Sequence, residues 1–308
     1  MLDSFAAQAA MIAGLCCLVL VGPLVAYFFL QRRKRRAREL KRSPIGILLL
    51  RSPGHSLRAE LDEAQDDIVS DAMILTFMPV FVAAIYLTQG HIEGLQKMQH
   101  LMPFYILATV AFIAWMIRKL WKASERLDIL KTGYDAELAV GQELDQLMRL
   151  GARVFHDFPA ENFNIDHIVI AKEGVFAVET KGYTKRGDLR GREGARVVYD
   201  GAALRFPHMT RTEPLEQAKR QAEWLAKWLG SAVGQPVRVM PVLALPGWFV
   251  ERTGKGPIRV FSGRALSALL RTGDAWAVSE SELARIAHQI EQRCRDVSPR
   301  YGEEVRAA

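Results

Sequence analysis

Two acidic residues and one lysine stand at spacings that predict a single polar pocket. Asp166 lies in the segment IDHIVIA (165–171), and Glu179 and Lys181 end the segment VFAVETK (175–181). Both segments are mostly apolar, and the short KEG sequence between them ends in glycine, which is typical of a hairpin turn. Because side chains alternate along a strand, an antiparallel pairing around this turn brings Asp166 near Glu179 or Lys181.

Carboxylates held this close repel one another, and burial makes their charge more costly. A divalent cation such as Mg²⁺ or Mn²⁺ relieves the repulsion, because hard cations bind carboxylate and carbonyl oxygens and keep several waters. The predicted metal ligands are Asp166, Glu179 and the backbone carbonyl of Thr180. A bound cation activates water and stabilises charge on a phosphate, while Lys181 holds the attacking water or the phosphate oxygens. The predicted chemistry is metal-dependent hydrolysis of a phosphodiester bond.

The Glu-x-Lys spacing alone is not distinctive, since Glu39 and Lys41 repeat it in a basic segment. A surface ion pair on an edge strand is the alternative for Glu179 and Lys181. The second acid, the hairpin spacing and the apolar faces of both strands favour a pocket. Further basic residues follow the second strand and are either phosphate contacts or part of a solvated loop: Lys185, Arg186, Arg190 and Arg192.

The elements that position these residues form a mixed α/β domain over residues 120–308, with helices on both sides of its sheet. Before the hairpin, the pattern predicts a helix over 120–150 and a strand over 153–158. After it come a second hairpin around Asp200, which extends the sheet, and a helix over 213–229. The rest of the domain has strands at 236–245 and 257–261 and a helical extension over 263–295, whose last helix begins at Ser279.

The segment NIDHIVIAKEGVFAVETKGY resembles the signature of the nuclease-related domain family (NERD), which is grouped with the PD-(D/E)xK nucleases. The resemblance runs from about Gly133 to about Leu245, and GYDAELAVGQELDQL and EPLEQAKRQAEWLAKWL are similar to two of its helices. It implies a restriction-endonuclease-like core and nuclease activity. It also implies that Asp166, Glu179 and Lys181 occupy catalytic positions.

The same resemblance assigns two supporting residues on helices. Glu137 corresponds to the helix glutamate of the family and Gln217 to its helix glutamine. The family glutamate usually follows a glycine, whereas Ala136 precedes Glu137 here, and Glu143 is nearby. From the residues alone, Gln217 and Gln221 share one helix face and are ordinary solvated glutamines.

The first 119 residues form a membrane region with three uncharged, apolar runs. A helix needs about 20 apolar residues to cross a bilayer core, and each run is close to that length. The sequence therefore predicts transmembrane helices over about 5–30, 72–90 and 99–117, with a cytoplasmic linker over 31–71, of which residues 43–71 carry no evident chemistry. The alternative for the second and third runs is a buried helical hairpin, but neither shows a polar face at helical spacing.

Charge around the runs predicts their orientation. Basic blocks follow the first and third runs (QRRKRRARELKR and RKLWKASER), while the loop HIEGLQK between the second and third has one acid and one base. The positive-inside rule then puts the N-terminus outside and the α/β domain in the cytoplasm, at a bacterial inner membrane. A cleaved signal peptide is the alternative for the first run, but its leading segment MLDSF has no basic residue. The block Arg32–Arg42 is a lipid-facing flank or, alternatively, a nucleic-acid contact.

Composition excludes several other classes. The 308 residues carry a formal charge of +7, and 24% are charged, so wholesale disorder is excluded. The three cysteines lack zinc-ligand spacing, which argues against a zinc site or a disulfide scaffold. No Walker A or Rossmann fingerprint is present, so we expect neither a nucleotide motor nor NAD chemistry.

The sequence thus predicts a membrane-anchored nuclease that uses Mg²⁺ or Mn²⁺ and acts on nucleic acid, with DNA as the expected substrate and the lipid bilayer as a second partner. Two alternatives remain open. One is a non-catalytic nucleic-acid-binding module, and the other is a structural membrane component that recruits a partner protein. A homodimer is one option for the oligomeric state, which the sequence leaves open together with DNA versus RNA and endo- versus exonuclease action.

Overall fold

The computed structural model describes residues 44–94, 96, 99–185, 187–188, 191–264, 266–271 and 278–299, with isolated positions before residue 44. The chain divides into two compact units. The first holds residues 1–44 and 62–128, and the second holds residues 45–61 and 129–308. The predicted helix over 5–30 falls almost entirely outside the described residues.

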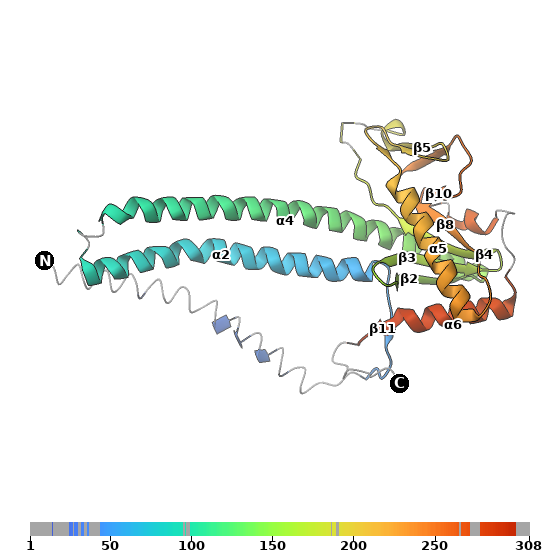
Figure 1. The fold of residues 1–308 in the computed structure, drawn as a ribbon, viewed down its shortest axis with the longest axis horizontal. Coiled ribbons are helices and arrows are strands. Elements are labelled where there is room, and N and C mark those ends of the chain that lie inside the picture. The colour runs from blue at the N-terminus through green and yellow to red at the C-terminus, as the bar shows by residue number, and fades with distance from the viewer. Residues whose placement is uncertain are drawn as a thin grey trace. The chain divides into compact units, whose positions relative to one another are not determined.

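The first unit contains two long helices that run antiparallel (Figure 1). They are the main parts of α2 (His55–Glu93) and α4 (Met102–Asp145), and a short 3₁₀ turn, η1 (Gln99–Leu101), precedes α4. The Tyr105 hydroxyl donates to Gln89 Oε1 at 2.8 Å near their connection. At the opposite end of the apolar region, an ion pair joins the two helices, with Lys119 Nζ 2.6 Å from Asp71 Oδ1.

Both helices are long and apolar enough to cross a membrane, by length and composition. Their most apolar 18-residue windows have mean hydropathies of 2.1 and 1.8, and only 6% of each window is buried. The predicted span at 72–90 lies within α2, and the predicted span at 99–117 covers η1 and the start of α4. Each helix continues beyond its predicted span, and α4 also takes in most of the helix predicted over 120–150. The acidic segment before residue 71 continues into α2, and the basic segment after residue 117 continues α4. A change in polarity does not end a helix where no glycine or proline interrupts it.

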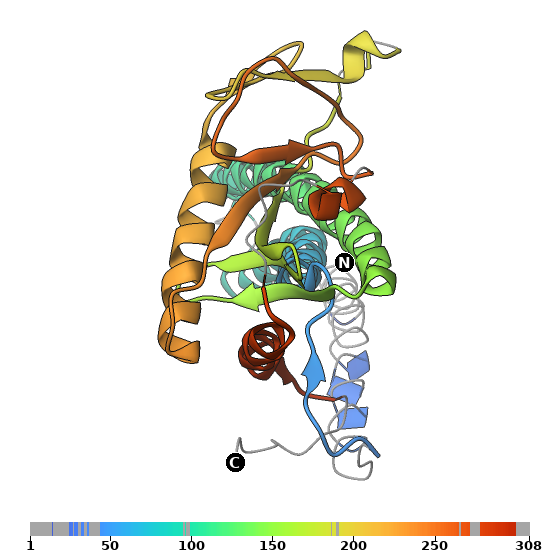
Figure 2. The ribbon, with the colours of Figure 1, turned by 90° about the vertical axis from the view of Figure 1, so that its right-hand side faces the viewer.

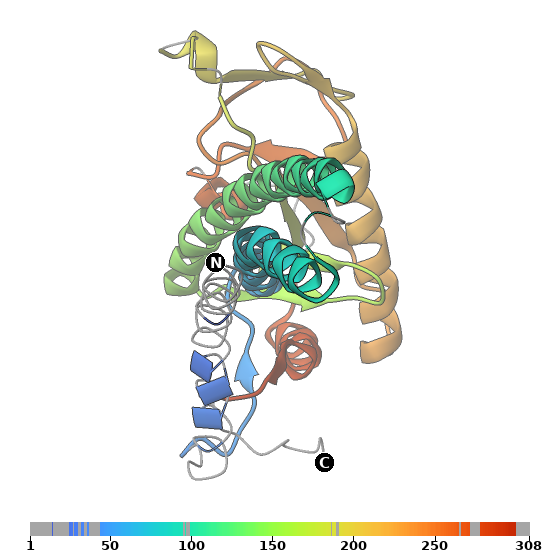
Figure 3. The same ribbon diagram turned by 90° about the vertical axis from the view of Figure 1, so that its left-hand side faces the viewer.

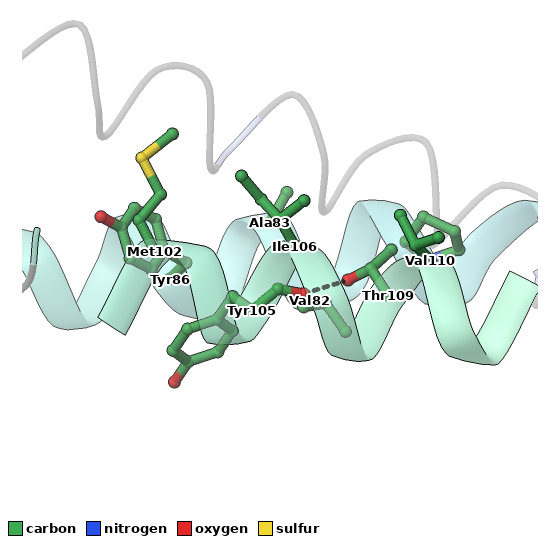
Figure 4. A pocket seen from close by; sticks show the side chains of 9 residues that line it. Val82, Ala83, Tyr86, Met102, Tyr105, Ile106, Thr109 and Val110 are labelled. Atoms are coloured by element: carbon green, nitrogen blue, oxygen red, sulfur yellow. Dashed lines mark hydrogen bonds between the residues drawn. The ribbon is translucent and has the colours of Figure 1, made fainter. Parts of the chain in front are cut away.

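A pocket of about 260 Å³ lies between the two helices beside Pro79 (Figure 4). Its lining is apolar apart from the hydroxyl groups of two tyrosines and Thr109. The Thr109 hydroxyl donates to the Tyr105 carbonyl of its own helix at 2.8 Å, which satisfies it locally. With no charged group in the lining, this pocket is not a candidate for hydrolytic chemistry.

The second unit is built on a mixed five-stranded sheet in the order β10-β8-β4-β3-β2. The strands β2, β3 and β4 pair antiparallel, and β4, β8 and β10 pair parallel. Their bounds agree closely with the predicted strands: β2 (Arg153–Pro159), β3 (Asn164–Ala171), β4 (Gly174–Thr180), β8 (Val239–Ala244) and β10 (Arg259–Phe261).

Helices cover both faces of this sheet, as the mixed α/β class predicts (Figures 2 and 3). One face buries β-strand residues such as Ile168 and Ala177 against α5 (Glu213–Val233) and α6 (Glu280–Cys294). The other buries Phe176 and Val178 against the end of α4 and η4 (Leu266–Arg271). A 3₁₀ turn, η2 (Gln146–Leu150), joins α4 to β2. As predicted, Ser279 caps α6, and its hydroxyl accepts from the Glu282 N–H.

The second predicted hairpin belongs to a separate sheet, so the expectation that it extends the main sheet is wrong. This second sheet has four strands in the order β7-β6-β5-β9. The edge beside β8 is occupied by β10, and the hairpin instead packs Val197 and Leu204 with Trp248 against the first turns of α5. The strands are β5 (Arg196–Tyr199), which follows η3 (Glu193–Ala195), β6 (Leu204–Arg205), β7 (Thr210–Arg211) and β9 (Phe249–Arg252).

Residues 45–61, which lie in the predicted linker, belong to the second unit. Within them, β1 (Leu49–Leu50) pairs antiparallel with β11 (Arg295–Val297). The Arg51 side chain contacts Asp157 and Asp296. The segment that leads into α2 is therefore an integral part of the sheet-containing unit.

Candidate functional site

The β3–β4 hairpin holds Asp166 beside the end of β4. His167 pairs with Val178, so the same register continued by one residue sets Asp166 opposite Glu179. The Thr180 N–H donates to Asp166 Oδ2 at 2.7 Å, which fixes the carboxylate against the end of the strand. The hairpin thus brings together the two acids as the sequence predicts.

Glu179 and Lys181 form a close ion pair in the same place. Lys181 Nζ lies 2.6 Å from Glu179 Oε1, and the Glu179 side chain is only 1% exposed. The other carboxylate oxygen, Oε2, is buried and has no hydrogen-bond partner among the described residues. The backbone is fixed as well, because the Lys181 N–H donates to the Ala244 carbonyl of β8 at 3.0 Å. One oxygen of a buried carboxylate is therefore left for a further ligand.

Glu137 reaches this cluster from α4. A Cβ on Gly182 would lie 2.6 Å from the Thr132 carbonyl oxygen, so only glycine lets the end of β4 approach the helix this closely. Burial, followed by the charges of Asp157 and Glu179, raises the pKa of Glu137 from 4.5 to about 8. The alternative glutamate, Glu143, is exposed.

The pKa values of the other two acids are also raised. Burial raises the pKa of Asp166 well above its usual value, and the charges of Glu179 and Glu137 raise it further. Burial likewise raises the pKa of Glu179, against the opposing effects of Lys181 and Gln221. Burial lowers the pKa of Lys181, but the carboxylate of Glu179 more than compensates, so that the pKa is raised overall. These shifts describe three carboxyl groups that share one small, poorly solvated volume.

The two glutamines of α5 take different places. Gln221 is buried, and its Nε2 donates to the Asn164 carbonyl of β3 at 3.2 Å. It lies next to Glu179, whose pKa it lowers. Gln217, one turn earlier, lines an open pocket with Lys181. Gln221 is thus a polar neighbour of the acids, whereas the sequence alone predicts a solvated side chain there. Its spacing of one helical turn from Gln217 was the only pattern in the sequence that could have indicated this position.

Residues 132–246, a little over a third of the chain, match the family model of the nuclease-related domain. This segment is a nuclease-related domain. Its limits confirm the predicted span of resemblance, from about Gly133 to about Leu245. No curated protein and no solved structure matches the chain significantly. We call Asp166, Glu179 and Glu137, together with Lys181, the acidic cluster, and all four lie within the matched residues.

The oxygen groups of the nuclease-related domain fit a hard cation that retains water. In the described part of the chain, no three His, Cys, Asp or Glu side chains are arranged as a complete metal site. Two carboxylates, Asp166 and Glu179, are nevertheless adjacent, and one buried Glu179 oxygen is unpartnered. Mg²⁺ is commonly held by one or two carboxylates and completes its octahedron with waters and substrate oxygens. The residues present are sufficient for that kind of binding, with the Thr180 carbonyl as a third candidate ligand.

Replacing Glu137 should change how stability depends on pH. A carboxyl group whose pKa is about 8 in the folded state and 4.5 when unfolded binds more protons in the folded state between those values. The free energy of unfolding therefore falls as pH rises through this window. We expect Glu137→Gln to raise the Tm at pH 8 by several degrees and to flatten its decline between pH 5 and pH 8, as measured by thermal unfolding in the absence of metal.

The matched control is Glu143→Gln, which removes an exposed glutamate from the same helix. It should leave Tm and its pH profile unchanged, because exposed substitutions cost less than about 0.5 kcal/mol. If Glu137→Gln and Glu143→Gln give the same profile as the unchanged protein, Glu137 does not belong to the acidic cluster.

Proposed function

We propose that this chain is a membrane-anchored, metal-dependent nuclease whose nuclease-related domain hydrolyses phosphodiester bonds in nucleic acid, with DNA as the expected substrate. One observation carries the proposal. Inside a segment that matches a nuclease-related family, a hairpin holds two carboxylates and a lysine together at one end of a sheet. The proposed core is restriction-endonuclease-like, as the resemblance to PD-(D/E)xK enzymes implies.

The proposed roles follow from position and charge. Asp166, Glu179 and the Thr180 carbonyl would hold Mg²⁺ or Mn²⁺, which, when bound, activates a water and stabilises charge on the phosphate. The ammonium group of Lys181, held by Glu179, would orient that water or neutralise the phosphate oxygens. A bound cation would favour the ionised form of Glu137, which would then add negative charge to the site, and Gln217 would contact the substrate beside Lys181.

Membrane anchoring is supported by apolar surface that the described residues leave exposed. In each long helix the most apolar window is only 6% buried, whereas the core helix of a water-soluble protein is mostly buried. Trp115 and Trp121 are 58% and 68% exposed, close to the basic residues that follow the second apolar window. Aromatic and basic side chains of this kind favour the membrane interface. We propose a multi-pass protein of the bacterial inner membrane with the N-terminus outside and the nuclease-related domain in the cytoplasm.

The activity can be tested on the full chain in detergent with supercoiled plasmid. We expect nicked plasmid with Mg²⁺ or Mn²⁺ and none with EDTA, and no nicking by Asp166→Asn or Glu179→Gln. Glu143→Gln, an exposed change on α4, should nick at the normal rate. Single-stranded DNA and RNA in parallel reactions identify the preferred substrate. Equal nicking by the two site variants, or none by the unchanged protein with either cation, contradicts the proposal.

The anchoring is tested separately, in cells that produce the full chain. After cell lysis, the protein should sediment with membranes, resist extraction by alkaline carbonate and dissolve in detergent. Release by carbonate alone would show that α2 and α4 are not embedded in lipid.

A further inference from the structure

We infer that the second sheet and its loops form a surface for the nucleic-acid backbone beside the acidic cluster, with Arg211 and Lys185 as phosphate contacts. The inference rests on the proposed function, because it names where the substrate of that same site is held. We call this surface, made of the described residues between 183 and 212 together with β9, the basic lobe.

Positive charge is concentrated in the stretch of sequence that contains the basic lobe. Residues 183–212 contain seven Lys or Arg and three Asp or Glu, a net charge of +4, while the whole chain of 308 residues carries +7. More than half of the formal net charge therefore lies in about a tenth of the chain, directly after Lys181. A stretch of Lys and Arg beside a hydrolytic site is the usual electrostatic footprint of a phosphate backbone.

Part of this charge is neutralised within the protein and part is not. Arg205 pairs with Asp200 at 2.9 Å, and Arg196 pairs with Glu251 at 2.6 Å. Three other cations are exposed and form no ion pair with the described residues: Lys185, Arg192 and Arg211.

Two of these cations lie on aromatic rings. The Arg192 guanidinium is 4.0 Å from the ring centroid of Phe249, and Lys185 Nζ is 5.7 Å from that of Trp248. Such contacts reduce the freedom of the long side chains while leaving their charge without a counter-ion. They are therefore partly ordered before any ligand arrives.

Arg211 connects the basic lobe to the acidic cluster. It lines an open pocket of about 270 Å³ that also contains Lys181, Tyr183 and Gln217. The pocket has one carboxylate, from Glu213, which accepts a hydrogen bond from the Thr212 N–H at 3.1 Å and so caps its own helix. The remaining charged groups are two cations and the remaining polar groups are a phenol and an amide. That combination suits a phosphate group next to the one that Lys181 would serve.

Aromatic packing fixes the geometry between Lys181 and the lobe. The Tyr183 ring contacts Phe206 edge-on at a centroid distance of 5.0 Å, and Phe206 contacts Trp248 at 4.8 Å. The Trp248 indole N–H donates to the Tyr183 carbonyl at 3.1 Å. The backbone that follows Lys181 is therefore held rigidly. A nucleic-acid strand bound to the basic lobe would keep a constant position relative to the acidic cluster.

These groups bind phosphates rather than base edges, so we expect recognition without sequence preference. The test is the affinity of the full chain for a short fluorescein-labelled DNA duplex in EDTA, measured by anisotropy at several salt concentrations. Arg211→Gln and Lys185→Gln should each weaken binding several-fold and reduce the salt slope, log Kd against log salt, by about 1. Lys227→Gln, which removes one charge from an exposed site of α5, should leave both quantities unchanged.

The outcomes separate this inference from the proposed function. Equal affinity and slope for Arg211→Gln, Lys185→Gln and the unchanged protein would overturn the basic lobe even if the protein cleaves plasmid. An equal loss with Lys227→Gln would also overturn it, because the effect would then be one of total charge. Loss confined to the two lobe variants supports it even if no cleavage is found. Single-stranded DNA and an RNA duplex, as further probes, show which backbone the lobe prefers.

Discussion

Replacing Lys181 with methionine is expected to slow plasmid nicking by about 100- to 1000-fold, the usual loss when one stabilising donor is removed from an active site. Methionine keeps the length of the side chain and removes its charge. Two effects combine. The ammonium group no longer serves the water or the phosphate, and the buried Glu179 loses the cation 2.6 Å away that favours its ionised form. A protonated Glu179 is a poor metal ligand, so higher Mn²⁺ should be needed for any residual activity.

The control is Lys172→Met, in the turn of the same hairpin. That lysine is 71% exposed and, among the residues that the structure describes, pairs only with an exposed Glu280 at 3.2 Å, so nicking should stay at the normal rate. Both variants should retain the DNA affinity measured in EDTA if the basic lobe supplies most of the binding. Normal nicking by Lys181→Met would remove this residue from the proposed mechanism and weaken the case for a nuclease.

Local patterns were enough to predict the hairpin that carries the acids. Alternating apolar residues and a glycine turn defined β3 and β4, and the register between them follows from the turn length. The cap at Ser279 is equally local, because its partner is three residues away. The resemblance to a family then assigned Glu137, which no spacing along the chain connects with Asp166.

Contacts across long stretches of chain were not accessible in the same way. The hairpin at β5 and β6 has an ordinary strand pattern. The sheet to which it belongs could not be predicted, because β5 pairs with β9, some fifty residues later in the chain. The sequence also divides α4 into a span that ends at 117 and a separate helix over 120–150, and it starts the span of α2 at 72, because polarity changes there although no helix-breaking residue is present. Arg51 is the clearest case, because its two carboxylate partners are 106 and 245 residues away.

Arg51 links the segment before α2 to the strands of the site. Its Nη1 lies 2.8 Å from Asp157 Oδ2, and Asp157 is buried with a left-handed backbone (φ 48°). The Ser56 hydroxyl donates to the same oxygen at 2.7 Å and accepts from Asn164 Nδ2 at 2.7 Å. Asn164 precedes Asp166 by two residues on β3, so this network also supports the strand that carries a proposed metal ligand.

Arg51→Ala should therefore be strongly destabilising. It leaves Asp157 as a buried carboxylate without a cation, a loss that typically costs about 3–5 kcal/mol. For a domain of this size, about 3 kcal/mol corresponds to a fall in Tm of roughly 10 °C, measured by thermal unfolding of the full chain in detergent. Asp296→Ala removes the other partner of Arg51, which is 41% exposed, and should cost less than about 1 kcal/mol.

A double variant distinguishes the buried charge from simple loss of packing. If the cost of Arg51→Ala comes from an uncompensated carboxylate, then adding Asp157→Asn removes that charge, and the double variant should be more stable than Arg51→Ala alone. The free energies of the two changes could instead add, or Asp296→Ala could be as destabilising as Arg51→Ala. Either result would mean that the exposed ion pair with Asp296 and the alkyl chain of Arg51 hold the segment in place. In the first case the segment before α2 is tied to β2, next to the strand that carries Asp166, by one buried ion pair. Mutations there should then reduce nicking without touching any residue that binds metal or substrate.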